Sequence, residues 1–266
     1  MSESLKIAVL VKEVPDTYGD RHLDLETGLA DRGASDAVLD EIGGRAVEVA
    51  VSYAEANEGT EVVAVTMGPE SATKALREAL AIGADSAVHV SDEALAGADL
   101  GLTAEVLAAA VERLDVDLVL AGNQSTDGLG GVLPAMLAEL LGRPHATNLD
   151  AIEIAGDGIT GTRASDFGAM TLSTPLPAVA SITDRLPDAR FPSFKGNSAA
   201  KKKPLETLTA ADLGVAPENP EAPRSILISV AARPPREGGV KITDEGDGGA
   251  KIAEFLDQNR LIGEAS

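Results

Sequence analysis

Residues 122–131, GNQSTDGLGG, have the side-chain types and spacing best suited to bind a ligand. Gly128, Gly130 and Gly131 come just before an expected helix, whose first backbone N–H groups have no partner within the helix. Small polar side chains at residues 123–126 precede the glycines. Amides, the positive end of a helix and hydroxyl groups together suit a phosphate. On chemistry alone, the run is either an anion or nucleotide site or a glycine-rich turn that only begins a helix.

This run does not match the common phosphate-binding fingerprints. It contains neither G-x-G-x-x-G nor G-x-x-x-x-G-K-[ST]. A standard dinucleotide-binding turn and a P-loop are therefore not indicated.

Recognisable catalytic groups are missing from the rest of the sequence. There is no Cys, which excludes a thiolate zinc site and a cysteine nucleophile. The His residues are scattered: His89 fits a packed strand position and His145 a structural position in a loop. Asp40 and Glu41 fit the start of a helix, where a carboxylate interacts favourably with the helix dipole. We expect a chain that catalyses no reaction by itself.

A second unusual stretch, residues 191–205, reads FPSFKGNSAAKKKPL. It holds two of the four Phe residues and three consecutive Lys, in a chain whose formal net charge is −21. From Arg190 to Leu205 there are five basic residues and no acidic one. The composition favours a contact surface, and neither a strand nor a good helix is predicted here.

The net charge and the apolar pattern limit the classes of partner. A charge of −21 argues against nucleic-acid binding, because phosphate groups repel it. The first residues, MSESLKIAVLVKEV, do not form a signal peptide, and no stretch approaches the roughly 20 apolar residues of a membrane span. We expect a cytoplasmic protein with no nucleic-acid partner and no membrane insertion.

Four apolar runs alternate with helical patterns in the first half of the chain. The runs are largely aliphatic and fit strands buried on both faces, at residues 6–14, 61–68, 86–90 and 117–122. Apolar residues spaced by three and four predict helices over residues 37–56, 70–82, 100–114 and 128–142. This order predicts an α/β fold, a Rossmann-like, doubly wound, mostly parallel sheet. Ligands bind such sheets at the carboxyl ends of the strands, where residues 122–131 lie.

The pattern changes after residue 145. Residues 149–164 and 168–182 predict further strands and an antiparallel extension of the sheet. Residues 187–224 are expected to be irregular, apart from a short helix near 210–213. One more strand is predicted at residues 225–235, followed by a glycine-rich linker and a last helix at 250–261.

Several segments, in order, resemble the β subunit of electron transfer flavoprotein over nearly the whole chain. They are IAVLVKEVPDT, VVAVTMGP, ALAIGADSAVHV, VDLVLAGNQSTDGLGGVLPAMLAELLGRP, LPAVASIT and ARFPSFKGNSAAKKKPLETLTAADLG. The resemblance implies a heterodimer with an α subunit that mainly holds one FAD. It also implies an electron carrier, not an enzyme, between flavin dehydrogenases, such as the acyl-CoA dehydrogenases of fatty acid β-oxidation, and a quinone oxidoreductase.

In the common branch of this family the β subunit binds AMP as a structural ligand. In the electron-bifurcating branch the same site holds a second FAD, and this alternative stays open. A reading from another class, a stand-alone nucleotide-binding module of the stress-protein type, lacks residues 190–205 and the C-terminal arm. Both features are present in this chain.

The resemblance also assigns residues to the nucleotide. They are Leu10, Asp40, Glu41, Ile42, Gly43, Met67, Gly122, Asn123, Gln124, Ser125, Thr126, Asp127, Gly128, Leu129, Gly130, Gly131, Val132 and Leu133. Backbone N–H groups with Ser125 and Thr126 are expected to face the phosphate. A contact from the loop after the first strand, at Thr17 or Tyr18, to the flavin stays open.

Residues 189–205 match the family's partner recognition loop. Arg190, Phe191, Phe194 and Lys195 are the expected partner-binding residues, with Phe194 as the apolar anchor. The alternative is that the two Phe side chains pack inward. The Lys run at 201–203 is either a solvated stretch or a docking contact.

The sequence thus divides into four parts. Residues 1–188 form the α/β nucleotide-binding core, and residues 206–235 form the rest of that core. The recognition loop, residues 189–205, separates them. Residues 236–266 form a C-terminal arm that is expected to pack on the α subunit.

Overall fold

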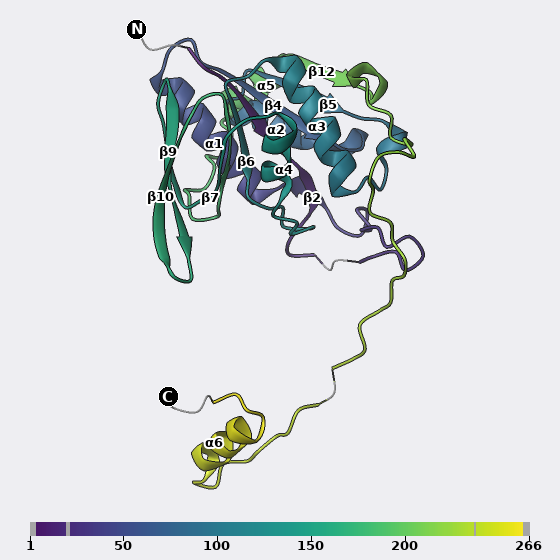
Figure 1. Cartoon of the computed structure of the whole chain (residues 1–266), viewed down its shortest axis with the longest axis vertical. Coiled ribbons are helices and arrows are strands. Elements are labelled where there is room, and N and C mark those ends of the chain that lie inside the picture. Colours follow the sequence, from purple (N-terminus) through teal and green to yellow (C-terminus); the bar gives the residue numbers. More distant parts are fainter. Residues whose placement is uncertain (1–3, 20–21, 237, 263–266) are drawn as a thin grey trace. The chain divides into compact units, whose positions relative to one another are not determined.

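Seven parallel strands form the central sheet (Figure 1). The computed structural model describes residues 4–19, 22–236 and 238–262. The strands run in the order β12-β5-β4-β1-β6-β11-β7, and every neighbouring pair is parallel. Their bounds are β1 Lys6–Leu10, β4 Glu61–Met67, β5 Ser86–Val90, β6 Leu118–Gly122, β7 His145–Leu149, β11 Ala178–Ile182 and β12 Leu205–Leu208.

Helices cover both faces of this sheet. One apolar cluster joins the sheet to α1 (Glu41–Ala56), α2 (Thr73–Ile82) and the end of α5 (Phe194–Ala200). The opposite cluster joins it to α3 (Leu100–Leu114) and α4 (Leu133–Leu140). Three short 3-10 helices, η1 Glu70–Ala72, η2 Glu93–Leu95 and η3 Ala211–Leu213, complete the helical elements of this part.

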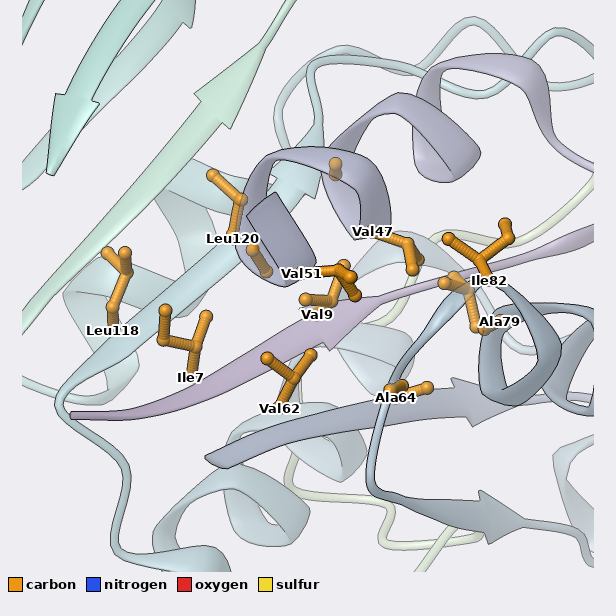
Figure 2. Close-up of a cluster of buried hydrophobic side chains, with 14 of the residues drawn as sticks. Ile7, Val9, Val47, Val51, Val62, Ala64, Ala79, Ile82, Leu118 and Leu120 are labelled. Atoms are coloured by element: carbon orange, nitrogen blue, oxygen red, sulfur yellow. The ribbon is translucent and has the colours of Figure 1, made fainter. Parts of the chain in front are cut away.

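The central strands are apolar throughout because both of their faces are buried. In β1, Ile7 and Val9 belong to the cluster under α1 and α2, whereas Ala8 and Leu10 belong to the cluster under α3 and α4. Figure 2 shows Val9 beside Val51 of α1. Each fully buried side chain of this size contributes about 1.5–3 kcal/mol. The structure confirms the predicted doubly wound parallel sheet.

Two smaller antiparallel sheets complete the strand structure. β8 (Ala151–Ile154), β9 (Gly158–Ser165) and β10 (Gly168–Pro175) form a three-stranded sheet, which confirms the predicted antiparallel extension. Residues 178–182, predicted with it, instead form the parallel strand β11 of the central sheet. β2 (Glu13–Pro15) pairs with β3 (Ala37–Leu39).

The β2–β3 pair corrects two sequence predictions. The apolar run at 6–14 is divided between two sheets, because the chain leaves the central sheet after Leu10. The helix predicted from residue 37 begins at Glu41, because residues 37–39 are extended and Asp40 caps the helix.

Three further predictions are wrong. The helix expected over residues 128–142 covers only Leu133–Leu140. Residues 187–224 are not irregular throughout, since they contain α5 and β12. Residues 225–235 form no strand, because no strand of the described chain pairs with them.

Residues from Ala231 onward form a separate unit. Its regular element is α6 (Gly248–Gln258), which has no buried residue among those described. Among the helices of the described residues, none combines the length and the apolar character that a membrane crossing requires.

Candidate functional site: a nucleotide loop and an exposed recognition loop

The order of the strands favours a binding site at the ends of β1 and β6. From β1 the chain continues to β4 and β5 on one side, and then returns to form β6 on the other side of β1. Ligands of open α/β sheets bind at such a change of direction, beyond the carboxyl ends of the strands. Leu10 ends β1 and Gly122 ends β6, and Leu10 pairs with Ala121. The nucleotide loop, residues 122–133, begins at this point.

Gly122 lets β6 approach the first turn of α1 closely. A Cβ atom built on Gly122 would lie 3.0 Å from Cγ2 of Ile42 and 3.2 Å from the backbone nitrogen of Gly43. A Cβ on Gly43 would lie 3.8 Å from the carbonyl oxygen of Leu10. The structure therefore brings Leu10, Ile42, Gly43 and Gly122 together.

Asp40 fastens the nucleotide loop to α1. Its Oδ1 accepts hydrogen bonds from the backbone N–H of Thr126 at 2.8 Å and from the Thr126 hydroxyl at 3.0 Å. Its Oδ2 accepts from the Gly43 N–H at 3.1 Å, the geometry of an N-cap. The Asp40 residue is only 3% exposed. The Thr126 hydroxyl hydrogen is thus used inside the protein.

Asp127 holds the next part of the nucleotide loop. Lys12 Nζ lies 2.8 Å from Asp127 Oδ1 and also donates to the Ser125 hydroxyl at 3.2 Å. Arg32 Nη2 lies 3.4 Å from Asp127 Oδ2. Burial alone raises the pKa of Asp127, but hydrogen bonds from Lys12 and Ser125, the Lys12 charge and the Gly128 N–H lower it to about 2. The carboxylate is therefore charged and neutralised by its neighbours.

The loop beyond Asp127 has free backbone donors. Gly128 N–H donates to Asp127, and Leu129 N–H donates to the Ser125 carbonyl. Within the described residues, the N–H groups of residues 130–132 have no acceptor. These three residues are exposed, and Val132, the residue before α4, makes no side-chain cap. Free amides before a helix fit a phosphate group.

The other residues predicted for the nucleotide surround this arrangement. Met67 ends β4, the neighbour of β1, and is half-buried. Glu41 is exposed and pairs with Arg45. Gln124 and Leu129 are exposed, whereas Asn123 and Leu133 are half-buried.

Phe191 and Phe194 of the recognition loop, residues 189–205, point into solvent. They are 97% and 92% exposed, so the inward packing considered from the sequence is wrong. Lys195 is also exposed. Both rings are consequently available to a partner.

Arg190 connects this loop to α1. Its guanidinium donates to Glu48 at 2.8 Å and to Glu55 at 2.6 Å. Burial raises the pKa of Glu48, but the hydrogen bonds and charge of Arg190 lower it below its ordinary value. Arg190 therefore holds the start of the recognition loop in place.

The end of the recognition loop is held from α2. Arg77 donates to the carbonyls of Ala200 and Lys203 at 2.6 and 3.2 Å. Lys203 Nζ donates to three carbonyls at the end of α2: Leu80, Gly83 and Ala84. The expectation that the Lys run is a solvated stretch holds for Lys201 and Lys202, which are exposed. It is wrong for Lys203, because the end of α2 offers carbonyl oxygens to a cation.

Comparison with known proteins shows the family to which the chain belongs. The model of the electron transfer flavoprotein domain matches residues 27–213. An electron transfer flavoprotein subunit β of Mycobacterium leprae is 46% identical over 264 residues, which cover 96% of this chain and 99% of the relative. The chain belongs to the electron transfer flavoprotein β-subunit family.

More distant members of the electron transfer flavoprotein family cover most of the chain too. The β subunit from Bos taurus is 37% identical over 79% of this chain and 82% of its own length. A caffeyl-CoA reductase–Etf complex subunit of Acetobacterium woodii is 34% identical over 88% of this chain and 90% of its own length. Family membership makes the chain an electron-carrier subunit, associated with a flavin, and not an enzyme by itself.

Two residues that contact the nucleotide loop were not predicted from the sequence. Lys12 and Arg32 neutralise Asp127. The position of Lys12 could have indicated its role, because it is a cation just beyond the buried strand β1. No sequence pattern indicates the role of Arg32, since it lies among irregular residues distant in sequence from Asp127.

Proposed function

We propose that this chain is the β subunit of a heterodimeric flavoprotein. It takes electrons from flavin dehydrogenases, such as acyl-CoA dehydrogenases, and passes them to a quinone oxidoreductase or another acceptor. FAD, held mainly by the α subunit, supplies the redox chemistry when bound. The residues of this chain bind a nucleotide, complete the heterodimer and present a docking surface.

The nucleotide loop is proposed to bind AMP. The observation that supports this most strongly is the set of free N–H groups at residues 130–132, beside the strand end at Gly122, where a Cβ would lie only 3.0 Å from Ile42. In this proposal those amides bind the phosphate. The end of β1 at Leu10 and Met67 contact the adenine. Thr126 and Asp40 act indirectly, because their hydrogen bonds with each other fix the loop.

Nucleotide extraction tests this proposal. The chain is co-expressed with an α subunit, and the purified heterodimer is denatured and its nucleotides are quantified. One AMP and one FAD per heterodimer are expected; absence of any adenine nucleotide besides FAD contradicts the proposal. Gly122→Ala should lower the AMP content at least about tenfold, because its Cβ displaces the first turn of α1. Gly156→Ala is the matched control, since its Cβ meets no atom within 4 Å.

A second FAD in the nucleotide loop is the alternative candidate. The family resemblance leaves this alternative open. The same extraction separates the two candidates, because two FAD and no AMP per heterodimer would establish the bifurcating type.

The recognition loop is proposed to dock the electron-donating dehydrogenase through Phe194. A single exposed aromatic side chain, held on a fixed backbone, fits the anchor of an interface. Phe194→Ala should weaken docking by about 2–4 kcal/mol and leave the flavin content unchanged. Phe167→Ala is a matched control, because Phe167 is fully exposed on the β9–β10 turn. The measurement is the rate of heterodimer flavin reduction against dehydrogenase concentration; loss of flavin in Phe194→Ala would instead mean a structural role.

The C-terminal unit is proposed to pack on the α subunit. Helix α6 carries Ile252 and Phe255 in exposed positions. Apolar side chains at this helical spacing need a surface to cover them. A partner subunit would supply that surface.

A further inference from the structure

The cations of the first unit divide into two groups. Most lysines and arginines of described residues 4–230 form ion pairs or donate hydrogen bonds to the described chain. Those that do neither are Lys74, Lys195, Lys201 and Lys202. All four are exposed. Within the described part of the first unit, the lysines that have no bonded partner thus lie in one restricted region, in a chain whose net charge is −21.

These four lysines lie around the recognition loop. Lys195 belongs to α5, and Lys201 and Lys202 directly follow it. Lys74 lies in the first turn of α2, the helix that packs against α5. Phe191 and Phe194 lie just before and at the first residue of α5. Exposed aromatic rings and lysines without a bonded partner are therefore neighbours in and around α5.

A groove joins the two helices on this face. It has a volume of about 710 Å³, and its walls come from α2, α5 and Pro192. Lys74, Arg77 and Lys201 line it, together with one acidic residue, Glu78. The positive region therefore continues from the recognition loop across to α2.

We propose that this lysine-rich groove is part of the docking surface, and that it binds an acidic rim around the apolar pocket that receives Phe194. The proposal rests on the docking function proposed above. The occupant is a flavin dehydrogenase with carboxylates beside its pocket. Charge complementarity argues for this occupant. The chain as a whole is acidic and repels an acidic partner, whereas the lysines of this region attract one. Such rim charges mainly increase the association rate and orient the encounter.

The test is the salt dependence of flavin reduction in the αβ heterodimer. The probe is a purified acyl-CoA dehydrogenase that reduces the wild-type heterodimer, and KM for the heterodimer is measured between low and high NaCl. For the wild type, KM should rise with salt, because ions screen exposed charges. Lys201→Gln combined with Lys202→Gln should raise KM about three- to tenfold at low salt, flatten the salt dependence and leave kcat unchanged.

A matched control removes the same charge from positions outside the recognition loop and the groove. Lys6→Gln combined with Arg113→Gln changes residues that already have acidic partners, Glu61 and Glu206. This control should keep the wild-type KM and salt dependence. Lys74→Gln alone should raise KM about two- to threefold, which would show that the surface extends from the recognition loop to α2.

Three outcomes would overturn the proposal. The first is an unchanged KM and salt dependence in the Lys201/Lys202 variant. The second is an equal change in the control variant, which would mean a general charge effect. The third is failure of the lysine variants to assemble with the α subunit, which would assign this face to the subunit interface. If no flavin dehydrogenase reduces the wild-type heterodimer, the docking function itself is wrong, and that result is distinct from all three.

Discussion

The nucleotide loop and the recognition loop use side chains and backbone in opposite ways. In the nucleotide loop, the side chains of Thr126 and Asp127 are bonded inside the protein, while backbone N–H groups at 130–132 face solvent. In the recognition loop, Arg77 and Lys203 hold backbone carbonyls, while the Phe194 ring faces solvent. A backbone surface suits a small anion, whose recognition needs donors in fixed positions. A side-chain surface suits a protein partner, whose recognition needs apolar area.

The largest effect is expected from breaking the nucleotide loop at Asp40. Asp40→Ala leaves three donors without an acceptor, two on Thr126 and one on Gly43. The free energy of unfolding should fall by about 3 kcal/mol, from the lost cap and the buried donors. Urea unfolding of the heterodimer measures it. Glu41→Ala is the control, because Glu41 is the exposed neighbour; equal loss in both variants would refute the role of Asp40.

Asp127 allows a pH test of the same loop. Against the effect of burial, hydrogen bonds and the charge of Lys12 lower its pKa from the ordinary 3.8 to about 2. A lowered carboxylate pKa adds stability that is fully present above about pH 4 and is lost as pH falls towards 2. The difference in unfolding free energy between wild type and Asp127→Asn should shrink across that range, by at most about 2 kcal/mol. Asp166→Asn, at an exposed position, should show no such shrinkage; a difference that stays constant with pH counts against the ion pair.

A smaller loss of stability is expected from Lys203, whose side chain holds the end of the recognition loop. Lys203→Met keeps the aliphatic stem but removes the donor to Leu80, Gly83 and Ala84. The unfolding free energy should fall by about 1 kcal/mol, with nucleotide content unchanged. Lys202→Met should have almost no effect, because Lys202 is exposed. Equal stability of the two variants would show that Lys203 does not support the loop.

Sequence patterns predicted the parts of the fold in which burial determines residue type. Strands β4, β5 and β6 and helix α3 lie where their apolar runs and spacing place them. Helix α5 could not be found in this way, because Ala200 is its only residue classed as buried. Gly196 in a sequence usually indicates a loop. In the structure it permits close contact with α2, because a Cβ there would lie 2.5 Å from the Ala81 carbonyl oxygen.

Tertiary pairing explains the remaining differences. Residues 225–235 have the composition of a strand, yet a strand needs a paired neighbour, and these residues pair with no strand of the described chain. At the nucleotide loop, the glycines and polar residues could be predicted from their types. The bonds of Lys12 and Arg32 to Asp127 could not, because charge pairing across long sequence separations leaves no local pattern.

Helix α1 touches both loops. Asp40 at its start is bonded to the nucleotide loop, while Glu48 and Glu55 are bonded to Arg190 of the recognition loop. These contacts span about 22 Å of one continuous helix, at 1.5 Å per residue. A helix transmits a rigid-body tilt from one end to the other. A ligand that tilted α1 as a rigid body at its start would therefore also move Glu48 and Glu55, the residues that hold Arg190.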